Sequence, residues 1–376
     1  MKKKILVVYG TAGIGHKKAA LAVKAALDEL KPDGVEASII DSLDYTNEFF
    51  KWAYLASYLL MVNKLPTFWG LSYYITDNPF VDLVVSKVRR VNNWLNSKKL
   101  REYLLQSQPD VIVSTHFFAG EVIADLKKRG LLRSKLITVV TDYRPHAWWI
   151  VDPTDMYVVA SDDAEQDLLR RGTAQNKIKI LGIPVEPVFS KSIGRKEALA
   201  KLGLKDGIFT ILVILGGFGV GPIGDIVKTI QRLSTPVRLV AVCGHNDALV
   251  KKLEGMKAGS PGELKVLGFI NNVYDYMEAA DLFISKPGGI SSTEAMAKEL
   301  PMIVVFPIIG QETRNSDFLV RHGAAVKIDN MAELKDAAGA LVSDPKRLEA
   351  MRENIRKIRK PFACYDIAKM AAEMCK

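Results

Sequence analysis

The sequence predicts an α/β protein made of two doubly wound domains, and three observations support this. Short apolar, β-branched runs alternate with helical stretches of about 10–15 residues, which is the pattern of βαβ units in parallel sheets. The runs form two series, and a segment with two prolines separates them. The chain has 376 residues, which is enough for two hydrophobic cores at roughly 100–200 residues per domain.

Each series predicts its own parallel sheet, because its runs are continuously apolar, as in strands that helices cover on both faces. The strands expected in the first series are Ile5–Tyr9, Val35–Ile40, Val111–Ser114, Leu136–Thr141, Met156–Ala160 and Lys179–Leu181. Those expected in the second are Phe209–Leu215, Arg238–Cys243, Leu264–Leu267, Leu282–Ser285, Met302–Phe306 and Ala325–Ile328. Ligand sites are expected after the strands, at their carboxyl ends.

The segment Gly182–Pro187 contains two prolines and precedes a polar stretch, which is typical of a domain boundary. We therefore expect an N-terminal domain over residues 1–188, with a helical insertion at about 45–105. A C-terminal domain is expected over residues 189–360, followed by a final helix at 361–376.

The charge and the cysteines restrict the class of protein. The net charge is +10, with clusters of Lys and Arg in residues 51–100 and 351–376. Such regions favour a polyanionic surface, either nucleic acid or anionic lipid, although a solvated face explains the charge alone equally well. Cys243, Cys364 and Cys375 are too few for a disulfide scaffold and lack metal-site spacing, which indicates a reducing compartment.

No segment has the pattern of a spanning or secretory helix. The markedly apolar run Trp52–Asn63, which has no charge, is twelve residues long, whereas a spanning helix needs about 20 residues. The apolar run Ile5–Tyr9 is too short for the core of a signal peptide. We therefore expect a cytoplasmic protein.

A glycine-rich loop, Gly10–Ala20, follows the first predicted strand and leads into a helix. Its glycines, among them Gly13 and Gly15, allow close approach of a ligand, and the helix start favours an anion. The spacing fits neither a Walker A loop nor a dinucleotide fingerprint, although Asp41 could imitate the ribose-binding acid of the latter. His16 lies in the first helical turn, where the dipole favours a neutral imidazole. It is a candidate general base, or a polar residue that bonds a nearby loop.

The second series carries two further glycine-rich turns, Gly216–Gly219 and Ser285–Ala295. In the latter, N–H groups and the hydroxyls of Ser291 and Ser292 at a helix start form an anion cradle. Glu294 has two interpretations. The spacing from Ser291 fits a capping box, and the carboxylate could equally bind ribose hydroxyls.

Polar side chains gather after the next strand, in Pro307–Asn315. Gln311, Glu312 and Asn315 could contact several hydroxyls at once, as a sugar ring requires. The alternative is an ordinary solvated loop.

The insertion is rich in aromatic and basic residues. Residues 49–94 contain eleven of the 31 aromatics, with Lys and Arg between them. This mixture suits a bilayer interface, although many of the rings must be buried in a core. We expect contacts to the acceptor or the membrane from Trp52, Trp69, Lys87, Arg89 and Arg90.

Taken together, these motifs resemble glycosyltransferase family 28, and within it the branch of monogalactosyldiacylglycerol synthase and processive diacylglycerol glucosyltransferase. The resemblance covers nearly the whole chain. The segments that carry it are Gly13–His16, Gly182–Val185, Gly216–Gly217, Lys286–Gly289, Glu294–Ala295, Pro307–Asn315 and the acceptor-facing loop Thr141–Trp149.

The resemblance implies a GT-B fold, in which two Rossmann-like domains face each other across a cleft. It implies inverting transfer from a UDP-sugar to diacylglycerol, without a metal or any other cofactor and without nucleic acid. The enzyme would lie on the anionic inner face of the cell membrane, and its last helix would return to the N-terminal domain.

The resemblance also assigns roles to residues. His16 would be the base and Asp142 its support, with Gly13, Gly15 and His146 on the acceptor side. Gly217, Phe218 and the two serines would contact the diphosphate, Glu294 the ribose, Phe269 the uracil, and Gln311 and Glu312 the sugar. The full donor set is Gly216, Gly217, Phe218, Phe269, Gly288, Gly289, Ser291, Ser292, Glu294, Gln311, Glu312 and Asn315.

Three other functions remain possible at this point. A relative on the same scaffold could transfer N-acetylglucosamine to a polyprenyl-linked peptidoglycan precursor, and a UDP-N-acetylglucosamine 2-epimerase shares the scaffold without a lipid acceptor. A basic nucleic-acid-binding protein would leave both phosphate cradles unexplained. The aromatic and basic insertion favours the lipid acceptor.

Overall fold

The chain forms two compact units, each built on its own parallel sheet. The computed structural model describes residues 2–11, 13–216, 221–256 and 262–375. Unit 1 comprises Met1–Pro187, Ile308–Arg314 and Lys360–Lys376. Unit 2 comprises Val188–Pro307 and Asn315–Arg359. The predicted α/β class is confirmed, and the roles predicted for the two domains stay predictions.

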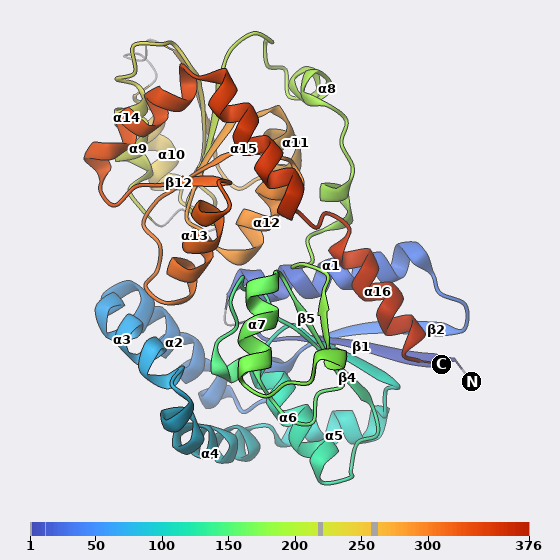
Figure 1. Cartoon of the computed structure of the whole chain (residues 1–376). Coiled ribbons are helices and arrows are strands. Elements are labelled where there is room, and N and C mark those ends of the chain that lie inside the picture. Colours follow the sequence, from blue (N-terminus) through green and yellow to red (C-terminus); the bar gives the residue numbers. More distant parts are fainter. Residues whose placement is uncertain (1, 12, 217–220, 257–261, 376) are drawn as a thin grey trace. The chain divides into compact units, whose positions relative to one another are not determined.

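Within the described residues, the sheet of unit 1 has six parallel strands in the order β2-β1-β3-β4-β5-β6 (Figure 1). The strands are β1 (Lys3–Tyr9), β2 (Val35–Asp41), β3 (Val111–Ser114), β4 (Lys135–Val139), β5 (Met156–Val159) and β6 (Ile178–Ile180). Each end lies within two residues of its prediction. The match follows from burial, because all four residues of β3 are buried and leave no polar alternation.

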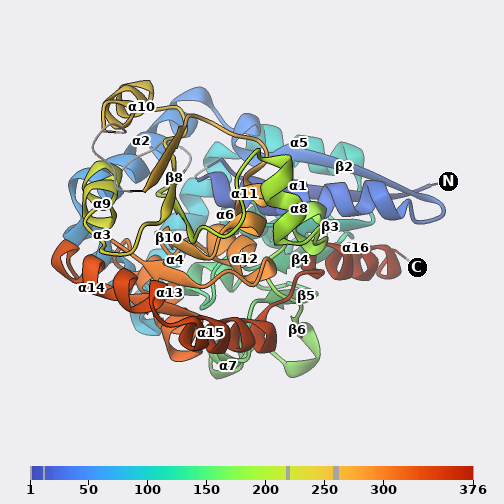
Figure 2. The same cartoon turned by 90° about the horizontal axis from the view of Figure 1, so that it is seen from above.

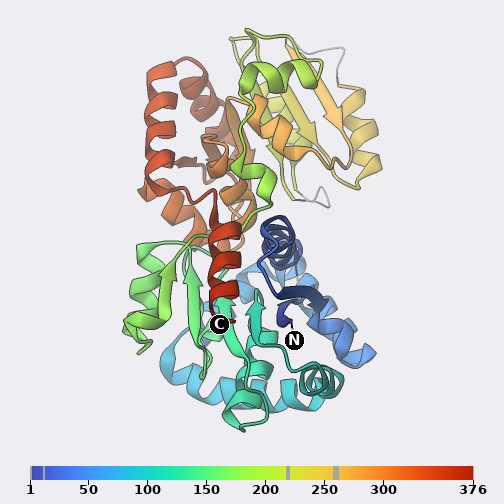
Figure 3. The same cartoon turned by 90° about the vertical axis from the view of Figure 1, so that its right-hand side faces the viewer.

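Helices cover both faces of this sheet. One face packs on α1 (Ile14–Leu30) and α16 (Ala363–Glu373), whose Ile367 is fully buried against α1 and the strands. Figure 3 shows α16 lying along the strands of this unit. The other face packs on α5 (Lys98–Ser107) and α6 (Phe117–Lys128). Unit 1 also holds α7 (Asp162–Arg170) and the short helices η1 (Ser42–Tyr45), η2 (Ala147–Trp149) and η3 (Gln175–Lys177).

Three consecutive helices form most of the segment between β2 and α5. They are α2 (Glu48–Lys64), α3 (Pro66–Thr76) and α4 (Pro79–Asn96). The sequence begins α2 and α4 with side-chain caps, because Asn47 accepts from the backbone of Phe50 and Asn78 from that of Phe80. Prolines at the first positions of α3 and α4 set the helical φ angle. Among the described residues, none of the helices is both long and apolar enough to span a bilayer.

The described part of unit 2 contains a six-stranded parallel sheet in the order β12-β11-β10-β7-β8-β9. Its strands are β7 (Thr210–Ile214), β8 (Arg238–Val242), β9 (Glu263–Leu267), β10 (Leu282–Ser285), β11 (Met302–Val304) and β12 (Ala325–Lys327). The helices that follow the linker are η4 (Pro187–Ser190), α8 (Arg195–Lys201), α9 (Ile223–Ile230), α10 (Asp247–Glu254), α11 (Val273–Ala279), α12 (Gly289–Ala297), α13 (Gln311–Arg321), α14 (Met331–Val342) and α15 (Pro345–Ile358). One large core joins the sheet to α9, α14 and α15, and Figure 2 shows α14 beside α9.

Candidate functional site

The predicted base, His16, lies in the first turn of α1, at the carboxyl end of β1. The helix begins at Ile14, with Gly13 before it and no side-chain cap. The ring is half-buried. His16 is therefore the third residue of α1, close to the end of β1.

Two threonines fix the orientation of the His16 ring. Its Nδ1 lies 2.8 Å from the carbonyl oxygen of Thr115 and 3.1 Å from Oγ1 of Thr141. A carbonyl only accepts, so Nδ1 carries the proton and Nε2 keeps its lone pair. The Thr115 hydroxyl donates in return to the carbonyl of His16 at 2.9 Å. The carboxyl ends of the neighbouring strands β1, β3 and β4 thus supply a histidine ready to accept a proton.

The surroundings keep this imidazole neutral. Burial lowers the pKa of His16 to about 4, and the bond to Thr115 opposes that shift only in part. The ring of His116 meets it edge-on at 4.6 Å, and the ring of Trp149 lies 5.8 Å away. At neutral pH His16 is therefore able to act as a base.

The two other histidines of unit 1 have structural bonds. The fully buried His116 caps α6, because its Nδ1 accepts from the backbone of Phe118 at 3.2 Å. His146 caps η2 through Nδ1, and its Nε2 donates to the carbonyl of Tyr73 at 2.9 Å. His146 thereby connects the loop after β4 to α3. Its predicted place beside the acceptor stays a prediction.

The other residues predicted on the acceptor side are spread over unit 1. Asp142 is half-buried beside Thr141 in sequence, and its charge contributes, after burial, to the raised pKa of Tyr73. Gly15 is the second residue of α1, next to His16. A Cβ on Gly13 would meet no described atom within 4 Å, so the backbone there is open to a ligand.

In the insertion, the predicted contacts face different ways. Trp52 and Lys87 are exposed, and Trp69 is half-buried. Arg89 and Arg90 form ion pairs with the buried Glu121 of α6. Sequence reasoning missed Glu121, because a single acidic residue in a helix gives no sign of its partners.

In unit 2, α12 presents the predicted anion cradle. The helix begins at Gly289 with Gly288 before it, at the carboxyl end of β10, so its first backbone N–H groups lack helical partners. Ser292 adds a buried hydroxyl that has no hydrogen-bond partner among the described atoms. Ser291, one position earlier, is half-buried. These donors suit a phosphate.

The capping-box interpretation of Glu294 is wrong. That motif would make Ser291 the cap, but the helix already begins at Gly289 and its cap, Gly288, makes no side-chain bond. Glu294 is instead buried in the second turn of α12. A buried carboxylate that does not cap its helix is consistent with the ribose-binding alternative.

Other predicted donor residues lie at two further places, after β7 and in α13. Gly216 follows β7 with φ of +98°, whereas Gly217 and Phe218 lie outside the described residues. Gln311, Glu312 and Asn315 all lie in the first turns of α13. Glu312 Oε2 accepts from the backbone N–H of Ile308 at 2.8 Å, and Asn315 is fully buried.

Phe269, predicted near the uracil, stacks on a histidine that sequence reasoning missed. Phe269 follows β9, and the ring of His245, which follows β8, lies parallel to it at 4.4 Å with an angle of 12°. The Phe269 side chain is largely exposed. The sequence could have pointed to His245, because this residue lies just after the predicted strand Arg238–Cys243. The pair presents a flat surface of the kind that stacks on a base.

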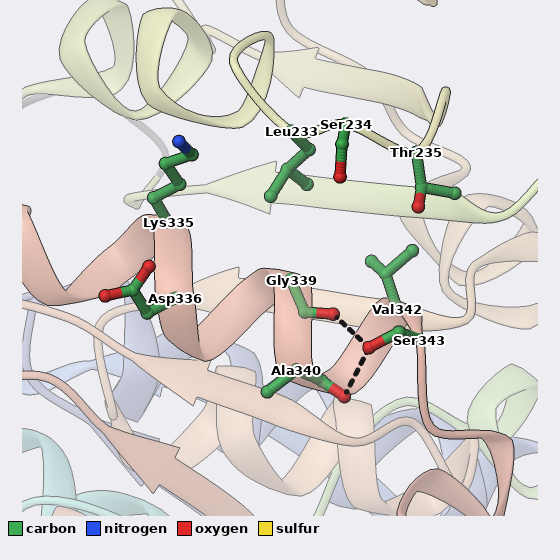
Figure 4. Close-up of a pocket in the computed structure, with 9 residues that line it drawn as sticks. All are labelled: Leu233, Ser234, Thr235, Lys335, Asp336, Gly339, Ala340, Val342 and Ser343. Carbon is green, nitrogen blue, oxygen red and sulfur yellow. Dashed lines mark hydrogen bonds between the residues drawn. The ribbon is translucent and has the colours of Figure 1, made fainter.

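Unit 2 also has a pocket of about 320 Å³ away from these residues. Figure 4 shows it between the segment after α9 and the helix α14. Its lining residues are Leu233, Ser234, Thr235, Lys335, Asp336, Gly339, Ala340, Val342 and Ser343. It contains none of the predicted site residues.

Two Rossmann-like units with sites after their strands define the GT-B class of glycosyltransferase folds. Residues 16–185 match the family model of monogalactosyldiacylglycerol (MGDG) synthase, and residues 223–358 match that of glycosyl transferases group 1. A processive diacylglycerol beta-glucosyltransferase of Bacillus pumilus is 30% identical over 369 residues, with 95% of this chain and 91% of that protein covered. The chain therefore belongs to the branch of glycosyltransferase family 28 that its motifs indicated.

Solved structures agree on the fold. MurG of Acinetobacter baumannii matches with a TM-score of 0.67 at 17% identity, over 99% of both chains. HepE of Anabaena in complex with UDP-glucose matches with a TM-score of 0.56 at 15% identity, over 98% of this chain and 99% of that one. At these identities the likeness concerns the fold alone, and the predicted GT-B fold is confirmed.

Proposed function

We propose that the chain is an inverting glycosyltransferase that moves glucose or galactose from a UDP-sugar to the hydroxyl of a diacylglycerol. The names of the relatives support the lipid acceptor, and the HepE complex with UDP-glucose supports the donor. The observation that carries the proposal is the neutral His16, held with Nε2 able to accept a proton.

The chemistry is a single displacement. The acceptor oxygen bonds to the anomeric carbon while the bond from that carbon to the diphosphate oxygen breaks, and the hydroxyl proton passes to His16 Nε2. UDP leaves with the bonding electron pair. A base whose pKa is about 4 when no ligand is bound becomes stronger beside the negative charge of a donor, because that charge favours imidazolium. Asp142 would orient or assist the base.

Unit 2, together with the first residues of α13, would hold the donor. The α12 start, with Gly288, Gly289 and the Ser292 hydroxyl, would stabilise the charge on the departing diphosphate in place of a cation. Glu294 would bind the ribose, and the stacked Phe269 and His245 would contact the uracil. Gln311, Glu312 and Asn315 would hold the sugar, and Gly216, Gly217 and Phe218 would lie at the diphosphate.

The decisive experiment is transfer from radiolabelled UDP-glucose or UDP-galactose to diacylglycerol in mixed micelles, followed by lipid extraction. The variant His16→Ala should lose at least about a hundredfold in transfer while still binding UDP. Thr141→Val is the matched control, because it removes a contact to Nδ1 and keeps the Thr115 carbonyl. It should lose less than about tenfold. Normal transfer by His16→Ala would rule out this base.

The same assay separates the alternatives. A peptidoglycan-type enzyme would label a polyprenyl-linked acceptor and use UDP-N-acetylglucosamine, and an epimerase would change that donor without an acceptor.

We further propose that the protein lies on the anionic inner face of the cell membrane, where diacylglycerol is found.

A further inference from the structure

Helix α4 has the reverse of the usual orientation of a surface helix. Its polar Arg89 and Asn93 face the protein, whereas one apolar stripe faces outward. The stripe consists of Phe80, Leu83, Val84, Val88, Val91 and Leu95, all of which are exposed. These residues recur at three- and four-residue intervals, so they lie on one side of the helix.

A buried polar cluster holds α4 in this orientation. The carboxylate of Glu121 on α6, whose side chain is 2% exposed, accepts from Asn93 Nδ2 at 2.6 Å and from Arg89 Nε at 3.2 Å. Arg90 Nε lies 3.4 Å from its other oxygen. The Arg89 guanidinium also lies 5.1 Å from the centre of the Trp148 ring. If α4 rolled over to bury its stripe, Glu121 would become an unpaired buried charge, which is strongly unfavourable.

The neighbouring helices also expose apolar side chains. Helix α3 packs on both α2 and α4, and each of these two helices has its own exposed apolar residues. On α2 and α3 the exposed residues include Phe49, Trp52, Leu59, Leu60, Phe68, Leu71, Tyr74 and Ile75. Lys64 and Lys87 are exposed in the same segment. Apolar side chains accompanied by lysines fit acyl chains beneath anionic headgroups.

We infer that α4 lies in the plane of the bilayer and buries its apolar stripe among the acyl chains. This inference rests on the proposed function, because a diacylglycerol acceptor is reached only at a lipid surface. Apolar contact would supply most of the binding, and the lysines would add attraction to anionic lipid. Binding by apolar contact persists in salt that screens charges, and it does not require anionic lipid.

The test uses sedimentation with phosphatidylcholine vesicles in about 1 M salt, where charge attraction is largely screened. The double variant Val84→Asp, Val88→Asp places charges at positions that are 64% and 68% exposed, so folding should be preserved. It should bind at least about tenfold more weakly than the wild-type chain. Val320→Asp is the matched control, a valine of α13 that is 41% exposed, and it should bind as the wild type does.

A second measurement reports depth directly. The native cysteines are buried, so Val88→Cys can be labelled selectively with an environment-sensitive fluorophore. Its emission should shift to the blue when vesicles are added, and the emission of labelled Val320→Cys should not. Equal binding by the double variant, or no shift at residue 88, overturns the inference. A third result would also overturn it: the wild-type chain is a dimer, and the double variant is a monomer that binds vesicles as well as the wild type does. In that case a second copy of the chain, and not the bilayer, covers the stripe.

Transfer by the wild-type chain to a short-chain diacylglycerol in detergent, measured in parallel, tests the proposed function separately. If that transfer fails, the proposed function fails, and the vesicle measurements still decide whether α4 inserts.

Discussion

At the scale of single residues, the tautomer of His16 is set by the backbone. The Thr115 carbonyl accepts from Nδ1, so no side-chain carboxylate is needed to leave the lone pair on Nε2. The environment of the ring lowers its pKa in the same way that it lowers the pKa of His146, which is also about 4. Burial is the main cause in both cases.

These two histidines predict a loss of stability in acid. Both titrate near 6.5 when unfolded and near 4 when folded, so the unfolded chain binds more protons in between. The free energy of unfolding should therefore fall as the pH falls through that window, by about 2 kcal/mol for each histidine between pH 7 and 5. Urea unfolding at the two pH values measures this. Burial also lowers the pKa of His116, which adds to the drop in the same direction, so His146→Gln should remove only its own share of about 2 kcal/mol. An unchanged drop in that variant would show that His146 is not the cause.

Single residues also show where sequence reasoning stops. The place of His16 in the first turn of its helix was predictable, because a glycine-rich turn after a strand leads into a helix start. Its partner Thr115 was not, because the contact joins loops 99 positions apart. The capping-box alternative for Glu294 failed because it depended on an exact helix start, and the helix begins at Gly289.

At the scale of elements, the strands were predictable because burial on both faces makes them continuously apolar. The orientation of α4 was not predictable. Its sequence contains apolar and basic residues, and only the buried Glu121 on another helix decides which side faces the protein. Arg89 and Arg90, expected at the acceptor or the membrane, have this carboxylate as a partner.

The polar cluster under α4 makes a prediction about stability. Glu121→Ala leaves Arg89 and Arg90 without their shared partner, so it should lower the free energy of unfolding by about 3 kcal/mol. The control is Glu102→Ala on α5, because Glu102 is exposed and its pair with Lys98 spans 3.9 Å. That variant should change stability by less than about 1 kcal/mol. Urea unfolding compares them, and equal effects would mean that Glu121 does not hold α4.

At the scale of the whole molecule, the two series of strands predicted the two sheets, but not every segment of each unit. Ile308–Arg314 lies inside the predicted C-terminal domain and yet belongs to unit 1, where Arg314 Nη2 donates to Asp77 Oδ2 at 2.5 Å. The ion pair joins residues 237 positions apart, so no local pattern could reveal it.

Each unit has its own core, so heating should unfold them in two transitions that respond to different changes. Ile367→Ala leaves a cavity between α16 and the sheet of unit 1, which should destabilise that unit by about 3 kcal/mol. On the proposed function, UDP at about 100 times its dissociation constant should stabilise unit 2 by about 2.7 kcal/mol.

Scanning calorimetry of the wild type and of Ile367→Ala, each with and without UDP, measures both effects at once. The substitution should lower one melting temperature, and UDP should raise the other. Ala363→Gly in the same helix makes a smaller cavity and should lower the same transition by less, because it removes only one methyl group. A single transition whose melting temperature is shifted by both Ile367→Ala and UDP would contradict this prediction, because the two units would then unfold together.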